Sequence, residues 1–289
     1  MKLTVVTGLS GAGKSVAMHA LEDLGYFCVD NLPVGLLVPL VDELRAREAS
    51  GGSDIDQTAV GIDARTPLDT LEQLPAHIEA LRAAGLETEL LFFDADDRVL
   101  IERFSETRRK HPLTTANIPL AEAIRRERER LGSIKALADL SIDTTRMHLP
   151  QLRELIWSRV HGRQPGHLSI LLLSFGFKGG LPHDADMVFD ARCLPNPHWE
   201  PALRTLTGRD REVAEFLSGH ELVQNYLSEV GSFLETWIPR FEAENRAYLT
   251  VAIGCTGGRH RSVYLVERLG ERLRRHRGTI QTRHRELAD

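Results

Sequence analysis

The sequence is short of cysteine and of long apolar runs. Its 289 residues include three cysteines, Cys28, Cys193 and Cys255, whose odd number and wide spacing exclude a disulfide framework and favour a reducing compartment. No apolar run approaches the roughly 18 residues that a membrane-spanning helix needs. A glycine-rich motif begins at residue 8 and leaves no room for a signal peptide, so we expect a cytoplasmic protein that does not enter the membrane.

The sequence also lacks a basic excess. Its 36 lysines and arginines are outnumbered by 41 aspartates and glutamates, and the formal net charge of −5 does not indicate nucleic-acid binding over the chain as a whole. Hydrophobic residues make up 42% and charged residues 27%, which is typical of a globular protein with a sizeable core. The length predicts one or two domains.

A complete G-x-x-x-x-G-K-S motif is present near the N-terminus. An apolar stretch precedes it and apolar residues at helical spacing follow it, which is the strand–loop–helix context of a phosphate-binding loop. The glycines let backbone N–H groups converge on a phosphate chain at the positive end of a helix. The motif predicts an ATP or GTP site in which Lys14 reaches the outer phosphates and the Ser15 hydroxyl binds Mg²⁺. Its residues are Gly8, Leu9, Ser10, Gly11, Ala12, Gly13, Lys14 and Ser15.

Several later apolar stretches end in an acid. Asp63 ends the stretch 58–63, and we expect it to contact Mg²⁺ directly or through water, so that the expected catalytic residues are Lys14, Ser15 and Asp63. The alternative is that Asp63 only caps the next helix. Asp30 ends the stretch 26–30 and is either a ligand or a helix cap. The alternation of strands with helices predicts an α/β fold for residues 1–160, a kinase-like P-loop domain with a doubly wound, mostly parallel sheet.

Residues 97–110 carry a cluster of basic side chains. In small P-loop kinases such arginines lie on a mobile lid and neutralise charge on the transferred phosphoryl group. A solvated helix face is the competing interpretation, because charge runs usually face water. The cluster consists of Arg98, Arg103, Arg108, Arg109 and Lys110.

Residues 160–167 interrupt the strand–helix alternation and have the composition of a linker. The strand–glycine loop–helix pattern then recurs, which predicts a second α/β domain over residues 166–289. In this domain Cys255, Gly258, Arg261 and Ser262 have the spacing of a tyrosine-phosphatase phosphate loop. Three interpretations of this loop are open: it binds a phosphate, its cysteine acts as a nucleophile, or it is a structural glycine turn.

Two features of this loop favour binding without hydrolysis. Gly254 stands where those phosphatases usually carry a histidine, and only Asp190 or His198 could be suggested as a general acid.

The C-terminal stretch carries a set of arginines that could neutralise RNA phosphates, although few aromatic residues accompany them. A solvated helix is the alternative. These arginines are Arg272, Arg274, Arg275, Arg277, Arg283 and Arg285.

Five segments together resemble the RapZ/YvcJ family of bacterial nucleotide-binding proteins, and the similarity extends over nearly the whole chain. They are residues 8–15, 28–33, 174–178, 194–199 and 252–264. The resemblance implies ATPase and GTPase activity, with Gly8–Ser15 as the ATP loop. It also implies a guanine-nucleotide segment made of Asp63, Ala64, Arg65 and Thr66.

The resemblance further implies that the second domain senses glucosamine-6-phosphate. The matching positions are Lys178, Asp190, Arg192, His198, Cys255, Thr256, Gly257, Gly258, Arg259, His260 and Arg261. Similar proteins form homo-oligomers, and enterobacterial members are RNase adapters that bind small RNAs and present one to an endoribonuclease. Those members end in a lysine- and arginine-containing tail, whereas this chain has no lysine after Lys178.

The sequence therefore favours a two-domain regulator with ATPase and GTPase activity. Two enzymatic alternatives stay open: a small-molecule P-loop kinase whose acceptor lies over Asp30, and a phosphatase that works through Cys255.

Overall fold

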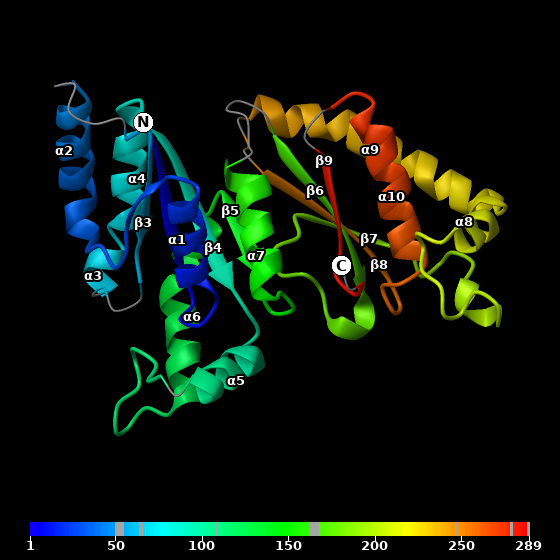
Figure 1. Ribbon diagram of the computed structural model, residues 1–289, viewed down its shortest axis with the longest axis horizontal. Coiled ribbons are helices and arrows are strands. Elements are labelled where there is room, and N and C mark those ends of the chain that lie inside the picture. The colour runs from blue at the N-terminus through cyan, green and yellow to red at the C-terminus, as the bar shows by residue number, and fades with distance from the viewer. Residues whose placement is uncertain are drawn as a thin grey trace. The chain divides into compact units, whose positions relative to one another are not determined.

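A computed structural model of the chain describes residues 1–49, 55–63, 66, 68–107, 109–161, 168–244, 246, 248–277 and 280–287. The chain divides into two compact units, Met1–Gly162 and Arg163–Asp289. Each unit contains its own parallel sheet with helices packed on it (Figure 1), which confirms the predicted α/β class. The expected linker overlaps the boundary between the units, and its residues 162–167 lie outside the described part of the chain.

The sheet of the first unit has five parallel strands in the order β2-β3-β1-β4-β5. The chain builds one side of β1 with β2 and β3 and then crosses to the other side for β4 and β5. Ligands of such sheets bind where the strand order reverses, at the carboxyl ends of the strands. The glycine-rich loop follows β1 and therefore lies at that point. The strands are β1 (Lys2–Gly8), β2 (Phe27–Val29), β3 (Gln57–Gly61), β4 (Glu87–Asp94) and β5 (Leu140–Asp143).

The helices of the first unit connect these strands. α1 buries Ala17, Met18, Ala20 and Leu21, because their helical spacing places them on one face. No helix in the described part of the chain is both long enough and apolar enough to cross a membrane. The helices are α1 (Lys14–Asp23), α2 (Leu37–Ala49), α3 (Leu68–Leu71), α4 (Leu74–Ala83), α5 (Asp97–Thr107), α6 (Leu120–Ala136) and α7 (Leu149–Ile156), with short turns η1 (Val34–Leu36) and η2 (Trp157–His161).

The sheet of the second unit has four parallel strands in the order β7-β8-β6-β9. They are β6 (Ser169–Gly176), β7 (Met187–Asp190), β8 (Tyr248–Cys255) and β9 (Ile280–His284). Its helices are α8 (Arg211–Ser218), α9 (Glu221–Ala243) and α10 (Arg261–Arg274), and two short turns are η3 (Phe177–Gly179) and η4 (Pro197–Trp199). The final stretch, which the sequence analysis treated only as arginine-rich, thus supplies the edge strand β9.

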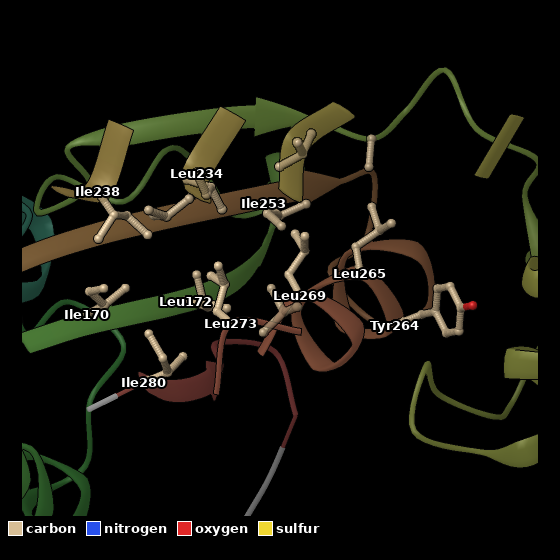
Figure 2. Packing of buried hydrophobic residues seen from close by; sticks show 14 of the residues in the cluster. Ile170, Leu172, Leu234, Ile238, Ile253, Tyr264, Leu265, Leu269, Leu273 and Ile280 are labelled. Carbon is tan, nitrogen blue, oxygen red and sulfur yellow. The ribbon is translucent and has the colours of Figure 1, made fainter. Parts of the chain in front are cut away.

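The main core of this unit lies between the sheet and its helices. Figure 2 shows Leu172 of β6 and Ile253 of β8 facing Leu234 of α9 and the apolar side of α10. In α10 the residues Leu265, Leu269 and Leu273 recur every four positions, and each is at most 1% exposed. This packing fixes the two elements that flank the Cys255 loop, strand β8 before it and helix α10 after it.

A buried polar chain connects β9 to the rest of the second unit. The Ser174 hydroxyl lies 2.8 Å from His284 Nδ1, and His284 Nε2 lies 3.0 Å from Glu267 Oε1. Arg209 Nε donates to the same carboxylate oxygen over 2.9 Å. Burial raises the pKa of Glu267, but the hydrogen bonds from His284 and Arg209 outweigh it and hold the pKa below its ordinary value.

This lowered pKa predicts a pH-dependent stability. A carboxyl group whose pKa is lower in the folded chain stabilises it above the unfolded value of about 4.3 and loses that effect as the pH falls through the folded value. We expect Glu267→Gln to lower the free energy of unfolding at pH 7 by about 1.5 kcal/mol, since charged hydrogen bonds are lost. The difference between wild type and variant should shrink below about pH 5. Urea unfolding from pH 7 to pH 3 measures it, and a difference independent of pH would contradict the assignment.

Candidate functional site

The glycine-rich loop between β1 and α1 has the conformation that its sequence predicts. Gly8 has φ 131°, and a Cβ at that position would lie 2.1 Å from the Phe93 carbonyl oxygen of β4, so only glycine fits. Lys14 Nζ donates to the carbonyl oxygens of Gly8 (2.5 Å) and Leu9 (3.1 Å), which places the ammonium at the mouth of the loop. Ser15 is exposed in the first turn of α1. The loop thus presents an ammonium and a hydroxyl beside a helix N-terminus, the chemistry of a triphosphate site.

A buried carboxylate braces this loop, and the sequence analysis missed it. Glu127 of α6 is fully buried and accepts hydrogen bonds from the Ser10 N–H (2.9 Å) and the Ser10 hydroxyl (2.7 Å). His111 Nε2 lies 3.0 Å from the same carboxylate, and the Leu113 N–H donates to His111 Nδ1 over 3.1 Å. Because Nδ1 accepts this hydrogen bond, Nε2 carries the ring proton and donates a hydrogen bond to the Glu127 carboxylate. A glutamate within an arginine-rich helical stretch gives no sequence signal that it is buried.

The charge state of Glu127 follows from these contacts. Burial raises its pKa, but hydrogen bonds from His111 and Ser10 and the nearby charge of Lys14 outweigh burial and hold the pKa below its ordinary value. Glu127 is therefore a fixed anion behind the loop, on which both the loop and His111 depend for a hydrogen-bond acceptor.

A second brace holds the middle of the loop, directly after Ser10. Arg103 Nη1 donates to the Gly11 carbonyl (3.0 Å) and to Thr144 Oγ1 (3.0 Å), while the Thr144 hydroxyl donates to the Ala12 carbonyl (2.9 Å). Burial lowers the pKa of Arg103, although Asp143 and Glu106 raise it. The Arg103 guanidinium is therefore engaged with the loop backbone and does not belong to a solvated helix face.

The rest of the basic cluster differs from Arg103. Arg98 is exposed and pairs with Glu102 one turn along α5. Arg109 and Lys110 are also exposed, and Arg108 lies outside the described residues. The structure thus divides the cluster into one side chain that shapes the loop and others that face solvent.

Two acids lie at strand ends on either side of β1. Asp94, at the end of β4, is 1% exposed and is bound by Arg128 (2.7 Å) and Lys135 (2.5 Å). Burial raises the pKa of Asp94, but these two cations outweigh burial and hold the pKa below its ordinary value. Asp63 follows β3, where the Ile62 N–H donates to the Val6 carbonyl over 2.9 Å and so places Asp63 beside the end of β1.

The Ser15 hydroxyl and the Asp63 carboxylate are oxygen donors of the kind that Mg²⁺ takes, and each follows the carboxyl end of a strand, β1 or β3. In nucleotide sites this ion takes one or two protein oxygens, and phosphates and water complete its shell. No group of three or more His, Cys, Asp or Glu suited to a metal occurs in the part of the chain that the structure describes, so a cage made only of protein ligands is not present there. Of the guanine-nucleotide segment, Ala64 and Arg65 lie outside the described residues, and the Thr66 N–H donates to the Asp63 carbonyl over 3.1 Å.

The second candidate site is the loop between β8 and α10. Cys255 is 3% exposed, and its Sγ accepts a hydrogen bond from the Gly258 N–H over 3.2 Å and lies 3.2 Å from Ser262 Oγ. A Cβ on Gly254 would lie 2.5 Å from the rings of Phe175 and Phe177, which explains why no histidine stands there. Thr256, Gly257 and Arg259 are exposed at the mouth of the loop.

The structure brings most of the predicted sugar-phosphate residues to the carboxyl edge of β6, β7 and β8. The Lys178 N–H donates to the Thr256 carbonyl over 3.3 Å, and the Ala191 N–H, next to Asp190, donates to the Gly254 carbonyl over 2.8 Å. The Arg192 guanidinium binds Asp190 and lies 3.9 Å from the centre of the Phe177 ring.

The two histidines of this set face differently. His198 is exposed, and its ring centre lies 6.4 Å from that of His260. His260 is 7% exposed, and its Nε2 lies 3.2 Å from the Leu203 carbonyl, so its side chain points into the protein. Burial lowers the pKa of His260, which favours the neutral ring.

The C-terminal arginines contact the second unit itself more than the sequence suggests. Arg272 binds Glu235 of α9 through two hydrogen bonds (2.8 and 2.7 Å), Arg274 donates to the Ile280 carbonyl, and Arg277 pairs with Glu242. Arg285 donates to the carbonyls of Gly176 (3.0 Å) and Gly180 (2.7 Å). Arg283 is half-buried on β9, and Arg275 is exposed. A uniform solvent-facing stripe is thus not what the structure shows.

Arg272 and Arg275 should consequently differ in their effect on stability. Arg272 also donates to Ser232 Oγ and lies over Gly231, where a Cβ would approach its guanidinium to 2.3 Å. We expect Arg272→Ala to lower the free energy of unfolding by about 1 kcal/mol, because a partly exposed ion pair and its hydrogen bonds are lost. Arg275→Ala, the matched control, should change it by less than about 0.5 kcal/mol. Urea unfolding of both variants measures this, and equal effects would contradict the role of Arg272.

Two family models match the chain. A model described as the RapZ-like N-terminal domain matches residues 1–164, and one described as the RapZ C-terminal domain matches residues 168–288. A nucleotide-binding protein of Thioalkalivibrio sulfidiphilus is 53% identical over 289 residues, and one of Hahella chejuensis is 50% identical over 288 residues. Each alignment covers 100% of both chains.

Solved structures match the chain more weakly. A sugar kinase from Janibacter sp. HTCC2649, in its unliganded form, is 20% identical with a TM-score of 0.37, over 54% of this chain and 92% of its own. A shikimate kinase from Bacteroides thetaiotaomicron is 15% identical with a TM-score of 0.35, over 54% and 98% of the two chains.

Proposed function

Because this chain belongs to the RapZ family, we propose that it is a nucleotide-binding regulator whose first unit hydrolyses ATP or GTP slowly with Mg²⁺. The observation that carries this proposal is the complete phosphate loop at the central strand β1, with Lys14 at its mouth and two braces behind it. Full-length relatives at about half identity are nucleotide-binding proteins, which supports the same conclusion.

Each residue of the site has a defined task. The backbone N–H groups of Gly11 to Ser15 hold phosphate oxygens, and Lys14 stabilises the charge that develops on the β- and γ-phosphates. Ser15 and Asp63 hold Mg²⁺, which neutralises phosphate charge when it is bound. The segment from Asp63 to Thr66 contributes to recognition of GTP.

Measuring both products of the reaction distinguishes hydrolysis from a kinase reaction. The full chain is incubated with ATP or GTP and Mg²⁺, with and without sugars and nucleoside monophosphates as acceptors. We expect free phosphate equal to the nucleoside diphosphate formed under every condition. A phosphorylated acceptor formed in an amount equal to the nucleoside diphosphate would instead identify the first unit as a kinase.

For the second unit we propose binding of an amino-sugar phosphate, glucosamine-6-phosphate, at the Cys255 loop. Backbone N–H groups and the Arg261 guanidinium supply phosphate donors, and Lys178, Asp190, Arg192 and His198 stand at the edge where the sugar would lie. Calorimetry of the full chain should detect binding of glucosamine-6-phosphate but not of glucosamine. Arg240→Ala, which removes an exposed arginine of α9 outside the predicted set, serves as a control for nonspecific charge and should bind like the wild type. Equal binding of both sugars would exclude a phosphate site.

Through the family resemblance we also propose homo-oligomers and an RNase-adapter role, in which the second unit binds a small RNA for an endoribonuclease. The exposed Arg275 supports RNA binding, because it can reach phosphates without loss of an intramolecular contact described above. Gel shifts over a salt series should show affinity that falls linearly on a log–log plot, and a weaker shift for Arg275→Ala. Binding indifferent to salt would count against the arginines.

A further inference from the structure

We propose that Cys255 accepts a phosphoryl group from acyl phosphates and forms an S-phosphocysteine. This inference rests on the proposed phosphate site at the Cys255 loop and adds a covalent step that binding alone does not include. Three observations carry it: the contacts of the sulfur, the buried Arg261 whose Nε has no acceptor among the described residues, and the ion pair of the neighbouring Asp190.

The sulfur lies at the base of the loop, where two groups are within hydrogen-bond distance of it. Sγ accepts the Gly258 N–H over 3.2 Å, and Ser262 Oγ lies at the same distance on the side of α10. Both groups can donate to a negatively charged sulfur, and the N-terminus of α10 adds positive potential. These contacts place the sulfur at the floor of the expected phosphate site, in position to attack a bound phosphoryl group.

Arg261 provides the second, independent observation. It is 4% exposed, and its Nη1 donates to the carbonyls of Arg192 and Leu194, each over 3.0 Å. Nη2 reaches Thr256 Oγ1 of the loop over 3.3 Å, while Nε has no acceptor among the described residues. Nε and Nη2 form one edge of the guanidinium, the edge that binds two oxygens of an anion. Because Nη1 fixes the group and Nη2 reaches Thr256, this edge faces the loop.

The state of Asp190 defines the class of donor. Asp190 pairs in register with Gly254, directly before Cys255, and the Glu286 carboxylate, which lies beside Gly258, is paired with Arg285. Hydrogen bonds from the Arg192 side chain hold the pKa of Asp190 below its ordinary value, so it carries no proton to give. A sugar phosphate has an alkoxide leaving group that needs such a proton. An acyl phosphate leaves as a carboxylate and needs none.

The proposed step balances without any other reactant. The Cys255 thiolate attacks the phosphorus, an S–P bond forms, and the bond between phosphorus and the acyl oxygen breaks. The electron pair of that bond leaves with the carboxylate, so the thiolate and the acyl phosphate become S-phosphocysteine and a carboxylate. Arg261 stabilises the equatorial oxygens during transfer.

The test is intact-mass analysis of the full chain after incubation with acetyl phosphate. We expect one added phosphoryl group on the wild type, mapped to Cys255, and none on Cys255→Ser. Cys193→Ser, which removes the exposed cysteine of the same unit, is the matched control and should label like the wild type. Arg261→Lys should label about 100-fold more slowly, because it loses the two-pronged edge.

Three further measurements make the result decisive. Glucosamine-6-phosphate should slow labelling by competition and should not itself label Cys255 or release phosphate. Equal labelling of wild type and Cys255→Ser, or label on another residue, would overturn the proposal. If Cys255→Ser unfolds, Ser262→Ala replaces it, and undiminished labelling of that variant would contradict the thiolate. Calorimetry separates the two levels: sugar-phosphate binding without labelling overturns this step alone, whereas loss of both overturns the proposed phosphate site.

Discussion

Lys14→Ala should lower the rate of nucleoside-triphosphate hydrolysis about 1,000-fold while the chain stays folded. The ammonium lies against the backbone of the loop, and the motif places it where the β- and γ-phosphates gain charge in the transition state. In the structure it donates to the Gly8 and Leu9 carbonyls of its own loop, and these two bonds bridge no other element. Its loss should therefore lower the free energy of unfolding by no more than about 1 kcal/mol.

Phosphate release with purified variants checks this expectation. Lys178→Ala is the matched control, because Lys178 is an exposed lysine of the other unit and should leave hydrolysis unchanged. Circular dichroism verifies that both variants fold. Turnover by Lys14→Ala within a few-fold of the wild type would mean that Gly8–Ser15 is not the hydrolysis site. It would thereby contradict the function proposed for the first unit.

Glu127→Ala should have the largest effect on stability, about 3 kcal/mol of lost free energy of unfolding. The carboxylate is fully buried and accepts three hydrogen bonds, two from Ser10 and one from His111. Removing it leaves these donors buried without an acceptor, and each orphaned donor keeps its full desolvation penalty. Because Ser10 belongs to the phosphate loop, we also expect weaker nucleotide binding.

A charge-neutral variant separates the two effects. Glu127→Gln keeps the shape of the side chain and one oxygen acceptor, but its amide NH₂ group replaces the other oxygen that Ser10 or His111 contacts. It should therefore destabilise the chain less than Glu127→Ala does. Glu129→Ala, on the exposed side of α6, should be close to wild type. Urea unfolding and nucleotide titration of the three variants measure both quantities. A wild-type unfolding curve for Glu127→Ala would contradict the brace.

Some of the site could be predicted because its chemistry is encoded locally. The loop at 8–15 needs glycines, a lysine and a serine at fixed spacing, so a strand–loop–helix reading was enough to locate it. The Cys255 loop was found for the same reason, and its backbone N–H and hydroxyl contacts to sulfur follow from that spacing. Gly254 was noted as a departure from phosphatases, but the two phenylalanine rings that require it come from β6 and η3.

The sequence misled where a charged residue had two possible environments. Arg103 and Arg272 lie on helices rich in charge, and composition alone favours solvent for both. In the structure Arg103 binds the phosphate loop and Arg272 joins α10 to α9. Their partners, Gly11 and Glu235, are separated from them by 92 and 37 positions. No local pattern carries information about pairs so far apart.

The amino-acid sequence by itself determined the two α/β units, the triphosphate loop and the cysteine loop, since periodicity and short motifs depend on neighbours within one turn or strand. Tertiary structure alone decided that Glu127 and Arg103 brace the first loop. It likewise decided that Asp94 is neutralised by two cations, and that Nε of the buried Arg261 has no acceptor among the described residues. The physical reason is that the charge state and availability of a polar group depend on burial and on partners brought together only when the chain folds.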